Sequence, residues 1–169
     1  SVHIGSFFIL MDLLGQANSL ATQIRSAYQE MQNQREGLNT QITTTVDQVN
    51  SYLTRIDDLN HQISLATGKA GGSPPNDLLD QRDQAVMELN QLIGVTTYEQ
   101  GDKISISLTK GGQSLLSGST IYPLQAVASA SDTSRTVLAY TLPAGSGKTI
   151  AVEMNDREVT GGKLGGLLQ

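Results

Sequence analysis

The chain has 169 residues, a net charge of −5 and no cysteine, with 38% hydrophobic but only 4% aromatic residues. This length allows one domain with a hydrophobic core, or two small domains. The acidic balance argues against nucleic acids and anionic membrane surfaces as partners, since both attract basic side chains. Without cysteine, disulfide bonds and thiolate chemistry are excluded.

The first residues form an apolar segment with the pattern of neither a signal peptide nor a membrane span. The apolar run at residues 7–11 has no basic region before it, and Asp12 follows it directly. We expect no apolar run to be long enough for a bilayer-spanning helix. Residues 1–10 differ in character from the rest of the chain. We interpret them as an expression remnant, with a native extended segment as the alternative.

A long amphipathic helix is predicted over residues 11–67, which contain no proline. Apolar residues recur there every three or four positions, which is the repeat of helices that pack as coiled coils. About 55 residues at 1.5 Å each would give a helix of about 80 Å. We expect it to be continuous or gently bent, and a break at Gly37 is the alternative because glycine is unfavourable inside a helix.

A shorter second helix is predicted over residues 76–93, after a glycine- and proline-rich turn at residues 68–75. We expect Asn76 to cap its N-terminus. Asp77 and Asp80 are expected in its first turn, where the helix dipole favours negative charge. The short turn between the two helices predicts an antiparallel hairpin.

The second helix is too short to cover the whole of the first. Folded back, it reaches only residues 51–67, so the apolar positions from Leu13 to Val49 have no partner. Each large side chain left in water forgoes about 1.5–3 kcal/mol of burial free energy. We therefore interpret these positions as an assembly surface, or as a sign that the chain is part of a larger protein. The candidate interface residues are Leu20, Ile24, Met31, Leu38 and Ile42.

After residue 94 the apolar pattern changes to a period of two, which predicts β-strands joined by glycine-containing turns. The expected strands are residues 95–98, 103–108, 113–116, 137–142 and 149–154. Residues 126–136, rich in serine and alanine, are expected to form a loop. The predicted fold class is therefore α+β, a long antiparallel helical hairpin followed by an antiparallel β meander.

No residue pattern supports catalysis, and we predict no enzyme activity, no metal and no cofactor. Residues 145–149 partly match a phosphate-binding loop, but Leu142 stands where that motif needs glycine. A strand is also expected to follow, whereas phosphate binding needs a helix N-terminus there. His3 and His61 are far apart, and no set of side chains has metal-ligand spacing.

Arg82 lies on the apolar face of the second helix. A charge in that position is unfavourable unless it is paired. The folded-back hairpin would bring it near Asp58, His61 and Gln62. We predict a hydrogen bond or ion pair from Arg82 to this stretch, with Asp58 as the favoured partner. Its role would be to fix the register of the hairpin.

Several motifs resemble the bacterial flagellar hook-associated protein family of the hook–filament junction. The most specific is PNDLLDQRD at residues 75–83. Residues 55–60 (RIDDLN), 111–118 (GGQSLLSG) and 161–168 (GGKLGGLL) also match, and the order of these motifs along the chain is that of the family. The resemblance covers residues 13–169. It implies a helical hairpin of a core bundle at 11–94, a β meander at 95–125, the start of an outer β-rich region at 126–160 and the start of a returning helix at 161–169.

The resemblance also implies a structural role in flagellum assembly, as one subunit of a ring between hook and filament. The partners it implies are further copies of the same protein, the hook protein, the neighbouring hook-associated protein and an export chaperone. It implies a location outside the cell, reached by type III export without a cleaved signal. The alternative is a coiled-coil adhesin or a binding module of a secretion apparatus.

Overall fold

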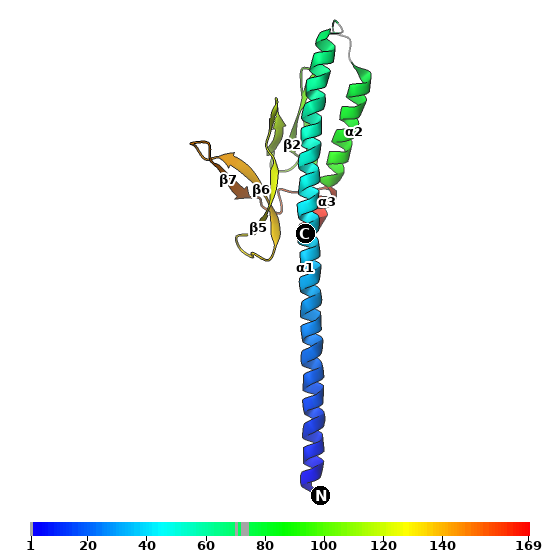
Figure 1. The fold of residues 1–169 in the computed structure, drawn as a ribbon, viewed down its shortest axis with the longest axis vertical. Coiled ribbons are helices and arrows are strands. Elements are labelled where there is room, and N and C mark those ends of the chain that lie inside the picture. The colour runs from blue at the N-terminus through cyan, green and yellow to red at the C-terminus, as the bar shows by residue number, and fades with distance from the viewer. Residues whose placement is uncertain (1, 70, 72–74) are drawn as a thin grey trace. The chain divides into compact units, whose positions relative to one another are not determined.

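The computed structural model describes residues 2–69, 71 and 75–169. It divides into two compact units, Ser1–Leu38 and Asn39–Gln169, and helix α1 (Val2–Lys69) contributes to both. A second helix, α2 (Asn76–Leu92), follows, and strands come after it (Figure 1). The predicted α+β class is thus confirmed. Helix α1 continues through Gly37, so the alternative of a break at this glycine is wrong.

The first unit consists of the N-terminal part of α1, and none of its described side chains is buried. Val2 to Leu10 are helical, so the alternative of an extended segment is wrong. By length and composition, α1 is also apolar enough to cross a membrane: an 18-residue window near its N-terminus has a mean hydropathy of 1.2. We had expected no apolar segment of the chain to be long enough for a bilayer-spanning helix, and this expectation is wrong. It considered only uninterrupted apolar residues, whereas an 18-residue segment can reach this mean hydropathy with a few polar residues in it. Signal sequences and core helices of soluble proteins also meet this criterion of length and composition, so one such helix is weak evidence of a membrane span.

The second unit contains two antiparallel sheets (Figure 1). The four-stranded sheet has the order β1-β2-β3-β4, and the three-stranded sheet has the order β5-β6-β7. The short helix α3 (Gly162–Leu167) follows the strands. The strands are β1 (Val95–Gln100), β2 (Lys103–Leu108), β3 (Ser114–Ser117), β4 (Thr120–Ile121), β5 (Leu124–Ala128), β6 (Thr136–Pro143) and β7 (Thr149–Glu153).

The expected strands all form, and two further strands were not predicted. Strand β4 has two residues, and β5 has few β-branched residues, so neither gives a clear period-two signal. The loop expected at residues 126–136 is therefore wrong in its first part. A two-residue turn joins β1 to β2, and Gly101 supplies the positive φ of 66° that such a hairpin turn requires.

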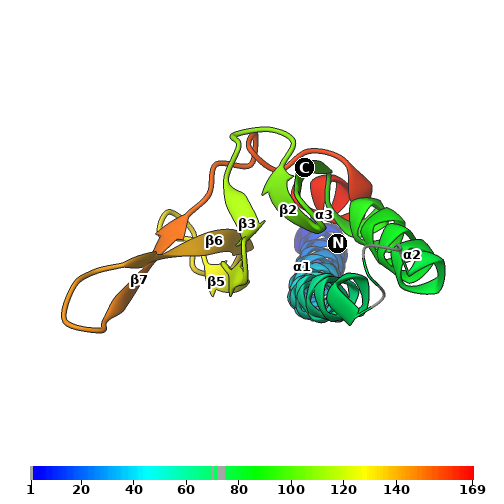
Figure 2. The same ribbon diagram turned by 90° about the horizontal axis from the view of Figure 1, so that it is seen from above.

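One hydrophobic core joins α1, α2, both sheets and α3. Ile42, Val46 and Val49 of α1 are buried in it, although the sequence predicted that they would have no partner. Figure 2 shows α3 next to α2 and α1, with β2 and β3 on the same side. The prediction failed at these positions because it considered only α2 as an element that could pack on α1, and not the strands or α3. The other core residues are Leu53, Ile56, Leu59, Ala85, Leu89, Ile93, Ile104, Ile106, Leu108, Leu115, Leu116, Leu124, Leu138, Met154, Val159, Leu164 and Leu168.

Candidate functional site: an asparagine ladder along helix α1

Asn60 is a buried polar residue in the apolar stripe of α1, and the residue is only 1% exposed. Its amide Nδ2 donates to the Ile104 carbonyl at 2.9 Å, and its Oδ1 accepts from the Ile104 amide at 3.1 Å. Strand β2 pairs with β3 only from Ile106 onward. The backbone groups of Ile104 that face the β3 side of β2 therefore have no strand opposite them. A side-chain amide has the donor and acceptor of a peptide group. Asn60 therefore takes the place of a neighbouring strand.

The same two-bond clamp recurs at Asn50, which pairs with the first residue of β5. Its Nδ2 donates to the Leu124 carbonyl at 2.8 Å, and its Oδ1 accepts from the Leu124 amide at 3.0 Å. Strand β5 is an edge strand of its sheet. Asn39 does the same at the start of β6: it donates to the Ser134 carbonyl at 2.8 Å and accepts from the Thr136 amide at 2.9 Å.

We call Asn39, Asn50 and Asn60 the asparagine ladder. They are eleven and ten residues apart, close to three turns of 3.6 residues, so they lie within about 80° of one another around α1. Each one bonds to a backbone N–H and a backbone C=O: at β2 for Asn60, at the edge strand β5 for Asn50, and at the start of β6 for Asn39. The ladder thereby fixes where both sheets attach along the helix. Sequence reasoning missed this role of Asn39, Asn50 and Asn60; their helical spacing was the available signal.

Arg82 joins the ladder at Asn60. Its Nη1 donates to Asn60 Oδ1 at 2.9 Å and to the Asp102 carbonyl at 2.7 Å. The predicted bond from Arg82 to the stretch of α1 around Asp58, His61 and Gln62 is confirmed, because Asn60 lies within that stretch. The favoured partner is wrong, since Asp58 is exposed to solvent. The role of fixing the register of the hairpin stays a prediction. Only neutral oxygens receive the described bonds of this buried guanidinium, and its Nε has no partner among the described residues. Arg82 therefore links α2, α1 and the β1–β2 turn.

Two predictions for the start of α2 are wrong. Pro75 is the N-cap residue, Asn76 is the first helical residue, and no side chain caps this end. The Pro75 carbonyl accepts from the amides of Leu78 and Leu79 instead. Asp77 is the acidic residue of the first turn, and Asp80 lies beyond it, exposed to solvent.

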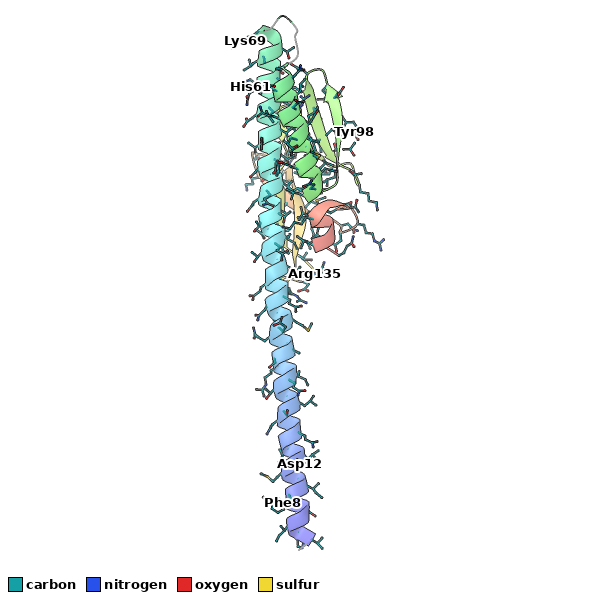
Figure 3. The ribbon with its side chains drawn as sticks, turned by 90° about the vertical axis from the view of Figure 1, so that its right-hand side faces the viewer. Phe8, Asp12, His61, Lys69, Tyr98 and Arg135 are labelled. Atoms are coloured by element: carbon teal, nitrogen blue, oxygen red, sulfur yellow. The ribbon has the colours of Figure 1, made fainter. Side chains whose placement is uncertain are left out.

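The candidate interface residues divide into two groups. Leu20, Ile24, Met31 and Leu38 are 57%, 60%, 63% and 45% exposed, which agrees with an unpaired apolar face. Ile42 is only 3% exposed and belongs to the core. His61 lies on the surface of α1 (Figure 3).

Glu153, at the end of β7, holds the loop between β5 and β6. Its Oε1 accepts from the Ser129 hydroxyl at 2.9 Å, and its Oε2 accepts from the Ala130 amide at 2.9 Å. These bonds, first that from the Ala130 backbone and then that from Ser129, lower the pKa of the Glu153 carboxyl. The charged form is therefore the one that orders the loop.

The lowered pKa predicts an acid-sensitive contribution to stability. A carboxyl whose folded-state pKa lies below its unfolded value of about 4.3 stabilises the fold above that value. The contribution is lost as the pH falls through the folded-state pKa. In thermal melts between about pH 6 and about pH 3, we expect Glu153→Gln to lose less stability on acidification than the wild type. Equal losses in the two proteins would contradict this assignment.

The described residues contain no group of three or more His, Cys, Asp or Glu side chains placed to hold a metal ion. What the fold does provide is a long helix bonded to two sheets by side-chain amides, with an apolar face left exposed. These features define a structural scaffold protein.

Comparison with known proteins gives the family. Residues 11–169 match the family described as "Flagellar hook-associated protein FlgK helical domain". The chain therefore belongs to the FlgK family. It is 40% identical over 157 residues to flagellar hook-associated protein 1 of Escherichia coli (strain K12), and 39% identical to that of Salmonella typhimurium (strain LT2). Each alignment covers 92% of this chain, which spans 28% of the length of these relatives.

A solved structure supports the same conclusion. The flagellar hook junction protein FlgK from Burkholderia pseudomallei matches with a TM-score of 0.74 and 42% sequence identity. The match covers 85% of this chain and 25% of that protein. The long helix and the antiparallel sheets are thus features that this chain shares with a junction protein.

Proposed function

We propose that the chain is a structural segment of a hook–filament junction protein of the bacterial flagellum. The observation that carries the proposal is the family match over residues 11–169, to relatives whose names place them at the hook and its junction. The protein would act outside the cell, after export without a cleaved signal, and would contribute to motility by joining hook to filament. An enzymatic role has no side-chain constellation behind it, and the family match favours this function over an adhesin or secretion module.

The exposed face of α1 supports an assembly role. Leu20, Ile24 and Met31 follow one another at steps of four and seven residues, so they lie on one side of the helix. Such a face is the packing surface of a helical bundle. We infer that another helix of the full-length protein covers it. Ring formation with further copies, and contacts with the hook protein, the neighbouring hook-associated protein and an export chaperone, belong to the same proposal.

Complementation tests this function. A full-length protein that contains this segment is expected to restore filament attachment and swimming in a strain lacking its own junction protein. Changing Leu20 and Ile24 together to glutamate is expected to abolish the rescue, because burying a carboxylate against apolar side chains is unfavourable by several kcal/mol. Gln29→Glu, on the opposite face of the helix, is the matched control and should rescue normally.

The melting temperature of the 169-residue chain provides the second readout. Leu20 and Ile24 are exposed here, so the double substitution should leave the melting temperature unchanged. Failure of the wild-type full-length protein to restore filaments would exclude the junction function. Normal rescue by the double variant would instead show that this face of α1 stays exposed in the flagellum.

A further inference from the structure

The outer edge of the four-stranded sheet presents an open row of backbone groups. Strand β1 is the first in the order β1-β2-β3-β4, so it has a neighbouring strand on one side only. The Gly94 carbonyl accepts from the Thr109 amide across the sheet, and residues that bond to the partner strand alternate along an antiparallel pair. The backbone groups of Val95, Thr97 and Glu99 therefore point away from β2. An edge of this kind can pair with a further strand.

Asn90 already occupies the first of these groups. Its Oδ1 accepts from the Val95 amide at 3.0 Å, which confirms that this amide points outward. Asn90 thus closes the beginning of the edge. Thr97 and Glu99 form the part of the edge that a partner strand can reach.

A groove of about 370 Å³ runs beside this edge, between β1 and α2. The side chains of Val95 and Thr97 lie on the face of the sheet that also carries their buried neighbours in β2, Leu108 and Ile106. A strand added at the edge would therefore direct every second side chain into the groove. The groove is lined by Asp83, Val86, Met87, Asn90, Val95 and Thr97, and Met87 is 53% exposed.

The charges at the groove select the partner. Helix α2 and β1 run in opposite directions from their connection near Gly94. Measured from this connection, Asp83 is about 15 Å back along α2, and Glu99 is about 16 Å forward along β1. Both carboxylates therefore lie toward the end of the groove that is far from Gly94. No basic residue occurs among the described residues that line the groove, and Arg82 is buried in its bonds to Asn60 and Asp102. This end of the groove is acidic.

We propose that the β1 edge and this groove bind an extended segment of another polypeptide by strand addition. The segment carries an apolar side chain that packs against Val86 and Met87, and a basic side chain two positions away that faces Asp83 and Glu99. A second copy of β1 fits poorly, because its sequence, VTTYEQ, contains no basic side chain to face Asp83 and Glu99.

Two capped six-residue peptides test the proposal, with the sequences TVTKTV and TVTETV. Amide chemical shifts of the 169-residue chain would be followed by NMR at low salt. The lysine peptide is expected to give saturable shifts at Thr97 and Glu99, and to bind about tenfold more tightly than the glutamate peptide. The double variant Asp83→Lys/Glu99→Lys is expected to reverse this preference.

Thr97→Pro removes the outward amide but no bond to β2, and proline is tolerated on edge strands. It should abolish binding, whereas Tyr98→Thr should not, because successive side chains of a strand alternate and Tyr98 therefore lies on the opposite face from Thr97. If Thr97→Pro does not fold, the charge reversal decides the question. Equal binding of both peptides, or shifts confined to other strands, would overturn the proposal. Concentration-dependent shifts at β1 without peptide would overturn it in favour of pairing between copies.

Discussion

Replacing Asn60 by leucine is expected to lower the free energy of unfolding by about 3–5 kcal/mol. The change removes three hydrogen bonds: two with Ile104 and one with Arg82. Leucine has a similar volume, so the loss does not come from a cavity. It comes from the unpaired backbone groups of Ile104 and from a buried guanidinium left with only the Asp102 carbonyl. Urea unfolding followed by circular dichroism measures the effect.

Two further variants separate the parts of this effect. Asp58→Asn changes the exposed residue that the sequence favoured as the Arg82 partner, and it should shift stability by less than about 0.5 kcal/mol. Combining Asn60→Leu with Arg82→Met should recover part of the loss, because the buried charge is removed together with its acceptor. An Asn60→Leu variant within about 1 kcal/mol of the wild type would disprove the structural role of this rung of the ladder.

Gly162→Ala is expected to lower the free energy of unfolding by about 3 kcal/mol or more. Gly162 has a φ of 63°, which side-chain-bearing residues rarely adopt. A Cβ there would lie 2.5–2.7 Å from the backbone of Leu92 and Ile93, where α2 ends. Neither backbone can move without opening the core beside Ile93, which is fully buried. The substitution therefore separates the C-terminal segment from α2.

Gly166→Ala is the matched control, in the same short helix. A Cβ at Gly166 would have nothing within 4 Å, and its φ is not in the left-handed region. Alanine also favours the helix over glycine by about 1 kcal/mol. The control should therefore match or exceed the wild-type stability in the same urea experiment. If the two variants unfolded at the same urea concentration, the close contact between Gly162 and the end of α2 would have no energetic weight.

Arg82 shows how far sequence reasoning reaches at the candidate site. Its place on an apolar helix face predicted burial, and the structure confirms that it is 8% exposed. The partner was wrong because an acidic side chain was sought for a positive charge. The hairpin instead presents the neutral Oδ1 of Asn60, and β2 and the turn before it complete the environment. Those strands are distant in sequence, so no helical pattern could have placed them.

The apolar repeat of α1 shows the same limit. Leu20 and Ile42 occupy equivalent positions in the pattern, yet one is 57% exposed and the other 3%. Local sequence fixes which side of a helix is apolar. Whether that side is covered depends on where strands and helices much later in the chain return, and the pattern within α1 contains no information about that.

The sequence by itself determined the long helix, the hairpin, most of the strands and the family, because periodicity, turn residues and motifs are local signals. Only the tertiary structure decided that Asn39, Asn50 and Asn60 would bind backbone groups of the two sheets, and that Ile42 would be covered while Leu20 was not. The physical reason is that a side-chain amide can form a hydrogen bond, and an apolar side chain can be buried, only where the fold places a suitable group next to it. Here those groups lie 44 to 97 residues away along the chain.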